Sequence, residues 1–166
     1  MDENRKKNKV SENPKLIKKI LGPLGFTDIA RNTQNRGTDN AKKGFDFNAK
    51  KGRIKVKIEV KASTFDKNGK IKGIPDAVGT EFTDVKIRGR PKFKADYLLV
   101  IGLKSSDPYQ AKKAYLVTKE VVNTYDHTVK PMVVFSSELK TKLRNAEKSD
   151  KEIKIIALNR KKCEVR

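Results

Sequence analysis

The clearest hydrophobic pattern in the chain lies between residues 54 and 61. Four β-branched residues alternate there with four charged ones: Ile54, Val56, Ile58 and Val60 against Lys55, Lys57, Glu59 and Lys61. Strict alternation predicts a half-buried strand, because side chains two residues apart lie on one face, about 6.6 Å from each other. We therefore expect Glu59 and Lys61 to share a face that is directed away from the core.

A second strand is predicted just upstream. Phe45 and Phe47 are apolar, whereas Asp46 and the residue after Phe47 are polar and point to the other side. The sequence Lys50-Lys51-Gly52 supplies a turn. If the two strands pair with their apolar faces together, Asp46 lies on the same face as Glu59 and Lys61.

The other hydrophobic segments predict a mixture of helices and strands. Residues 97–103 form a continuous apolar run, which is typical of a central strand covered on both faces. A helix is expected from Asn13-Pro14 to Gly22-Pro23, with Ser11 or Asn13 as its cap. The other expected helices begin at Thr118 and at Ser136 or Ser137, and the latter ends at about Ala146. Strands are expected at 26–30, 115–117 and 132–135, a strand or helix at 154–158, and a connection at Asp107-Pro108.

This order of elements predicts an α/β fold with one mixed central β-sheet flanked by helices. A chain of 166 residues is long enough for one domain with a sizeable core. We expect that domain to span residues 12–166 and a flexible basic tail to occupy residues 1–11.

Two polar segments, residues 31–43 and 62–94, lie between the predicted elements. Arg36 in the first is a candidate phosphate contact. In the second, Arg88, Arg90, Lys92 and Lys94 are spaced by two, so an extended backbone would place them on one face as a row of phosphate or base contacts. The run that begins at Arg88 also matches the four-residue core of an AT-hook. Solvated loops without a ligand are the alternative for both segments.

The charge balance points to a polyanionic partner. Lys and Arg number 40 and Asp and Glu number 20, which gives a formal net charge of +20. Such an excess is larger than solubility requires, and phosphate backbone is the partner that it fits best. A basic ribosome-associated protein, or an adaptation of overall charge, is the alternative.

Several classes of protein and of site are excluded by what the sequence lacks. Cys163 is the single cysteine and His127 the single histidine, which argues against a disulfide, a multi-cysteine zinc site and histidine-dependent nucleases. The glycine-rich loop of nucleotide triphosphatases is missing. Because no apolar run approaches the ~18–20 residues of a membrane span and no signal pattern is present, we expect a cytoplasmic protein that does not span a membrane.

The acids and lysine of the predicted hairpin suit metal-assisted phosphodiester hydrolysis. Mg²⁺ prefers hard oxygen ligands and keeps several waters, so Asp46 and Glu59 suffice as ligands and the Val60 carbonyl is placed to add a third oxygen. Lys61 would orient the attacking water or stabilise the developing charge. We expect Mn²⁺ to substitute for Mg²⁺. Glu12 is a possible accessory acid, although a glutamate there also complements a helix dipole.

Asp46, followed after twelve residues by Glu59-Val60-Lys61, resembles the motif of the PD-(D/E)xK nuclease superfamily, the restriction-endonuclease-like fold. Phe45 stands where the motif has proline. The buried run from Ala95 also resembles the strand that follows the catalytic hairpin in many type II restriction enzymes. The resemblance implies that Asp46 and Glu59 bind Mg²⁺ and that Lys61 is catalytic. An ordinary charged strand surface is the alternative interpretation.

Three functions follow as expectations. The first is a Mg²⁺-dependent, sequence-specific endonuclease of restriction type that cuts double-stranded DNA as a homodimer, whose two-fold symmetry would match a palindromic site. The second is a structure-specific junction or repair nuclease with the same site. The third is a non-catalytic basic nucleic-acid-binding protein.

Overall fold

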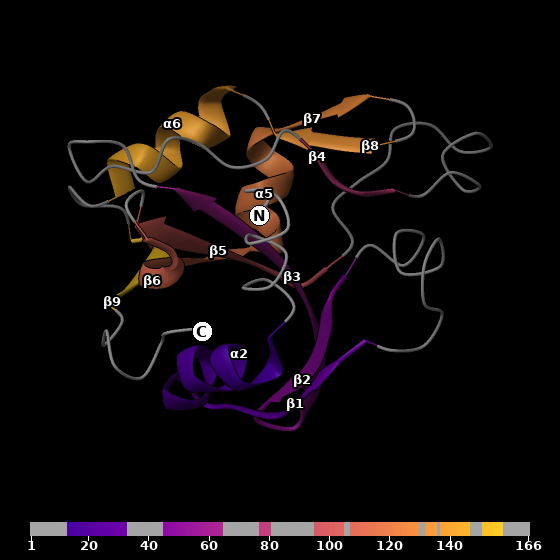
Figure 1. Cartoon of the computed structure of the whole chain (residues 1–166). Helices are drawn as coiled ribbons and strands as arrows, with labels where there is room; N and C mark the ends of the chain where they lie inside the picture. Colours follow the sequence, from indigo (N-terminus) through magenta and orange to yellow (C-terminus); the bar gives the residue numbers. More distant parts are fainter. Residues whose placement is uncertain are drawn as a thin grey trace.

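A mixed six-stranded sheet forms the centre of the fold (Figure 1). The computed structural model describes residues 13–32, 45–64, 77–80, 95–104, 107–129, 132–135, 137–146 and 151–157. The strands of the sheet, in spatial order, are β1 (Phe26–Arg31), β2 (Phe47–Lys51), β3 (Ile54–Thr64), β5 (Tyr97–Lys104), β6 (Asp107–Thr118) and β9 (Ile153–Ala157). The predicted α/β class with a mixed sheet is confirmed.

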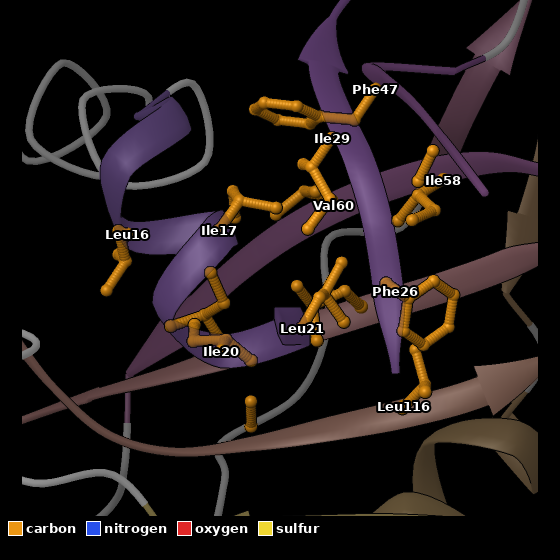
Figure 2. Packing of buried hydrophobic residues seen from close by; sticks show 14 of the residues in the cluster. Leu16, Ile17, Ile20, Leu21, Phe26, Ile29, Phe47, Ile58, Val60 and Leu116 are labelled. Carbon is orange, nitrogen blue, oxygen red and sulfur yellow. The ribbon is translucent and has the colours of Figure 1, made fainter. Parts of the chain in front are cut away.

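One face of the sheet is covered by helix α2 (Pro14–Leu21). The helix begins as predicted, because the side chain of Asn13 accepts a hydrogen bond from the Leu16 N–H at 3.2 Å and Pro14 occupies its first turn. A short 3₁₀ turn, η1 (Gly22–Leu24), follows it. The apolar side of α2 packs onto β1, β2 and β3 (Figure 2), through a first cluster that includes Ile17, Ile20 and Val60.

The opposite face of the sheet is also covered. Helices α5 (Lys119–Tyr125) and α6 (Ser137–Asn145) lie on that side (Figure 1) and bury a second cluster with Leu98, Val100 and Tyr115. Successive residues of β5 belong to the two clusters in turn, which confirms the prediction of a central strand buried on both faces. The helix expected from Thr118 is confirmed as well, since the Thr118 hydroxyl accepts from the Val121 N–H.

The pairing of β3 with β5 is parallel, and the other neighbouring strands of the six-stranded sheet are antiparallel. In the parallel pair, Glu59 lies opposite Leu98 and Lys61 lies opposite Val100. Paired residues in a sheet project to the same side. Glu59 and Lys61 therefore lie on the face that α5 and α6 cover, and not on an open solvent face.

A smaller antiparallel sheet joins β4 (Ala77–Thr80), β8 (Met132–Phe135) and β7 (Asp126–Val129). β8 was predicted, whereas β4 lies inside the segment 62–94 that we expected to be a polar loop. The first residues of this segment, up to Thr64, also belong to a strand, because β3 is longer than predicted. β4 forms because it pairs with β8, more than fifty residues further along the chain.

Two other boundaries differ from the predictions. β6 begins at Asp107, so Asp107-Pro108 belongs to a strand and not to a connection; proline is tolerated near the start of a strand. The turn of the hairpin consists of Gly52, whose φ is +64°, and Arg53. Lys50 and Lys51, which we expected in the turn, belong to β2. No helix among the described residues combines the length and apolar composition that a membrane span requires.

Replacing Leu99 by Ala should destabilise the fold strongly. Leu99 is fully buried at the centre of β5, and removing a buried leucine side chain costs about 2–5 kcal/mol because its burial is forfeited and a cavity remains. Ile54→Ala is the matched control, because Ile54 is 69% exposed and its removal should change stability by less than about 0.5 kcal/mol. Urea unfolding measures both. Equal effects would contradict the two-layer burial of β5.

Candidate active site

Asp46 lies at an irregularity where β2 begins. Its N–H donates to the carbonyl of Ile58 at 2.9 Å, while Phe47 is the residue paired with Ile58. Two successive residues thus face one residue of β3, as in a β-bulge. The extra residue reverses the alternation, so Phe45 packs in the second cluster and Phe47 in the first. The prediction that Phe45 and Phe47 share a face is wrong for this reason.

The carboxylate of Asp46 continues the hydrogen bonding of β3 beyond the end of β2. The last pair between the two strands is Phe47 with Ile58, and Asp46 Oδ2 then accepts from the Val60 N–H at 2.9 Å. The N–H and C=O of one strand residue point to the same edge of the strand. The Val60 carbonyl is therefore directed to the edge where the Asp46 carboxylate lies.

Glu59 is buried, with only 5% of its surface exposed. The alternation of β3 correctly predicted that Glu59 shares a face with Lys61. The expectation that this face is directed away from the core is wrong, because the second cluster covers it. Burial and, after it, the negative charge of Asp46 raise the pKa of Glu59 from 4.5 to about 8, whereas the positive charge of Lys61 acts in the opposite direction. Asp46 and Lys61 are thus charged neighbours of Glu59 that act on its pKa.

Lys61 completes the group. Its Nζ lies 3.6 Å from Glu59 Oε1, and its side chain is 24% exposed against 7% for Glu59. The structure thus brings Asp46, Glu59 and Lys61 together; Glu59 is buried, whereas Asp46 and Lys61 are partly exposed. Two carboxylates against one ammonium leave one negative charge when all three are ionised, in a chain whose formal net charge is +20. Such a site favours either a bound proton or a bound cation.

Asn32 holds the backbone of Asp46 and was not singled out by any sequence pattern. It is 3% exposed; its N–H donates to the Asp46 carbonyl at 2.8 Å and its Nδ2 donates to the Phe45 carbonyl at 3.4 Å. These hydrogen bonds hold the two peptide groups that flank the α-carbon of Asp46. Since they join residues 13 and 14 positions apart, local pattern alone gave no signal for them.

Replacing Asn32 by Ala should loosen Asp46. We expect a decrease of about 1–3 kcal/mol in stability, because the side-chain donor to the buried Phe45 carbonyl is removed. We also expect about a 10–100-fold decrease in any activity that depends on Asp46, as is found for residues that orient ligands. Asn48→Ala is the control, since Asn48 is an exposed asparagine of β2. Wild-type activity in a folded Asn32→Ala variant would contradict this role.

Other predicted site residues lie outside the described part of the chain, namely Glu12, Arg36, Arg88, Arg90, Lys92 and Lys94. Within the described residues, no three side chains of the types His, Cys, Asp and Glu gather into a metal-binding group. Asp96, just before β5, is structural: its Oδ2 accepts from the Lys57 N–H at 2.7 Å and its own N–H donates to the Lys57 carbonyl at 2.8 Å.

Comparison with known proteins leaves the candidate site to be interpreted from its own geometry. Neither the protein-family models nor the curated proteins searched include a match to this chain.

Proposed function

We propose that this chain is a Mg²⁺-dependent endonuclease that hydrolyses phosphodiester bonds of double-stranded DNA. One observation carries the proposal. Asp46, just before β2, and Glu59 of β3 bring two neighbouring carboxylates together, and Lys61 Nζ lies 3.6 Å from Glu59 Oε1. A net charge of +20 gives the same chain a strong attraction to phosphate backbone.

The donor set fits a divalent cation. Two carboxylates beside each other, one of them 5% exposed, repel each other unless a proton or a cation is shared between them. Mg²⁺ in nuclease-type sites uses one or two carboxylates and keeps its other positions for water and phosphate. Asp46 and Glu59 would hold it, with the Val60 carbonyl directed to the same edge of β3. When bound, the ion would supply hydroxide near neutral pH and positive charge beside the phosphate.

The residues of the chain have distinct tasks in this proposal. The Val60 N–H and Asn32 fix Asp46, so its carboxylate is oriented before substrate arrives. Burial keeps Glu59 away from bulk water, which strengthens its electrostatic interactions. Lys61 places an ammonium group beside Glu59, and its side chain is partly exposed, so it can orient a water or stabilise the charge that develops on the phosphate oxygens.

The fold is compatible with a restriction-endonuclease-like protein, and we propose that type. The strand that carries Glu59 and Lys61 pairs antiparallel with β2 and parallel with the buried strand β5. This supports the expected succession of a catalytic hairpin and a central strand. Sequence-specific cleavage by a homodimer is the finer proposal, since two identical sites related by two-fold symmetry would cut the two strands of a palindrome.

Cleavage of long unmodified DNA, with Mg²⁺ and again with EDTA, tests the proposal. Discrete fragments in Mg²⁺ alone are the expected result, and sequencing their ends would give the recognition site. Cleavage restricted to branched or nicked substrates would favour a structure-specific nuclease with the same site. Intact DNA in every divalent metal would contradict the proposed activity and leave a basic nucleic-acid-binding protein.

A further inference from the structure

We propose that the hairpin of β2 and β3 carries a binding surface for the phosphate backbone of duplex DNA, continuous with the candidate active site. The surface is a lysine row made of Lys50, Lys55 and Lys57. It is distinct from the contacts expected from the sequence, which were placed in the segments 31–43 and 62–94. This inference rests on the proposed nucleic-acid function and names the part of the fold that would hold the substrate.

The register of the hairpin places the row on the same face as the site. Lys55 and Lys57 precede Glu59 on β3 by four and two residues, so alternation directs all three side chains to one side. Lys50 is paired with Lys55 across the hairpin and shares that side. The position of Lys57 confirms the assignment, because its Nζ lies 5.3 Å from the centre of the Phe45 ring, which belongs to the second cluster.

The lysine row is exposed to solvent, whereas the candidate active site next to it is partly covered. Lys55 and Lys57 are exposed, whereas Glu59, two residues further along the same face, is buried. In Figure 1 the hairpin of β2 and β3 extends away from α5 and α6, the helices that cover this face of the sheet. A rigid substrate lying along the exposed part of β3 would therefore meet the row first, next to Glu59, where the covered part of this face begins.

Among the described residues, the charges of the row are poorly compensated. Lys50 and Lys55 are directly opposite each other, and like charges at such a position destabilise a sheet. Lys50 Nζ lies 3.4 Å from Asp28 Oδ2, and both side chains of this ion pair are exposed, so a phosphate can compete for the lysine. A local arrangement that costs stability without a structural benefit is typical of a functional surface.

The spacing of the row fits a duplex. Lys55 and Lys57 are about 6.6 Å apart along β3, and the backbone of one DNA strand carries a phosphate every 3.4 Å or so along the helix axis. Each lysine therefore reaches a different phosphate. From Lys55 to Lys61 the face extends for about 20 Å, which is several phosphates of one strand.

The test compares two double variants that lower the net charge equally, from +20 to +18. Lys55→Gln with Lys57→Gln removes two charges of the row. Lys15→Gln with Lys18→Gln removes two exposed charges of α2, on the opposite face of the sheet. Binding of the full chain to a labelled duplex is followed by fluorescence anisotropy over a series of KCl concentrations in EDTA, so that no cleavage occurs. Thermal unfolding confirms that both variants are folded.

The row variant should reduce the slope of log affinity against log salt by about 1.8, which is about 0.9 for each phosphate that is no longer neutralised. The α2 variant should leave the slope unchanged, and Lys55→Arg with Lys57→Arg should retain the wild-type slope. An unchanged slope in the row variant, an equal fall in both Gln variants, or no binding to duplex would overturn the proposal. So would tighter row-dependent binding of single-stranded DNA or RNA.

The outcome separates this inference from the proposed activity. A row-dependent slope in a chain that leaves DNA intact would retain the binding surface and reject the nuclease. Metal-dependent cleavage together with an unchanged slope in the row variant would retain the nuclease, and the DNA would then enter the site over another surface.

Discussion

Replacing Lys61 by Ala should reduce DNA cleavage about 10²–10³-fold, because one preorganised charge next to the reacting phosphate is removed. Lys61 Nζ lies 3.6 Å from the buried Glu59 carboxylate, and the Lys61 side chain is 24% exposed, so its ammonium group can contact substrate. Duplex affinity in Ca²⁺ or EDTA should fall less than tenfold or so, since one charge among 40 Lys and Arg is removed.

The comparison with Lys19→Ala makes this test specific. Lys19 is an exposed lysine of α2 on the other face of the sheet, and its removal changes the net charge by the same amount. Single-turnover cleavage and duplex binding are measured for both variants. If Lys61→Ala and Lys19→Ala cleave at the same rate, Lys61 has no catalytic role. If binding by Lys61→Ala falls in proportion to cleavage, the role of Lys61 is binding.

Glu59→Gln should yield a protein that is inactive and, in EDTA at alkaline pH, more stable than the wild type. The pKa of Glu59 is raised from 4.5 to about 8 in the folded chain. Between these values the folded state holds a proton that the unfolded state has released, so stability decreases as pH rises through this window. The total decrease is roughly 3–5 kcal/mol, since each tenfold change in proton affinity is worth about 1.4 kcal/mol.

The amide variant lacks this ionisation and should keep its stability across the window. Urea unfolding at about pH 5 and about pH 9 measures the difference. Added Mg²⁺ at about 100 times its dissociation constant should stabilise the wild type by about 2.7 kcal/mol at the higher pH, and should not stabilise Glu59→Gln. A wild type whose stability is flat between these pH values, or an equal effect of Mg²⁺ on both proteins, would contradict a cation-binding role for the pair.

Much of the secondary structure followed from local pattern. The start signal Asn13-Pro14 and the stop signal Gly22-Pro23 predicted α2, and the continuous apolar run at 97–103 predicted β5 with its two buried faces. These predictions held because period and apolar composition are properties of single segments. β4 was missed because its four residues form a strand only by pairing with β8, which is distant in the sequence.

The site was predicted in part for a related reason. The alternation of β3 indicated that Glu59 and Lys61 share a face, but it carried no information on whether distant helices cover that face. The hydrophobic pattern did not reveal the bulge at Asp46 either. A bulge reverses the side to which Phe45 points, but the order of apolar and polar residues around it is the same as in a regular strand. Asn32 was missed because its hydrogen bonds with Phe45 and Asp46 are tertiary.

The central claim is that the Asp46–Glu59 pair binds a divalent cation which, together with Lys61, breaks phosphodiester bonds. Cleavage of long duplex DNA by the wild type and by Asp46→Asn, each in Mg²⁺, in Mn²⁺ and in EDTA, tests it most directly. Asp28→Asn is the control, because Asp28 is an exposed acid of β1. We predict cleavage by the wild type and by Asp28→Asn in either metal, and none in EDTA or by Asp46→Asn. Intact DNA in both metals, or cleavage that persists in EDTA or in Asp46→Asn, would contradict the claim.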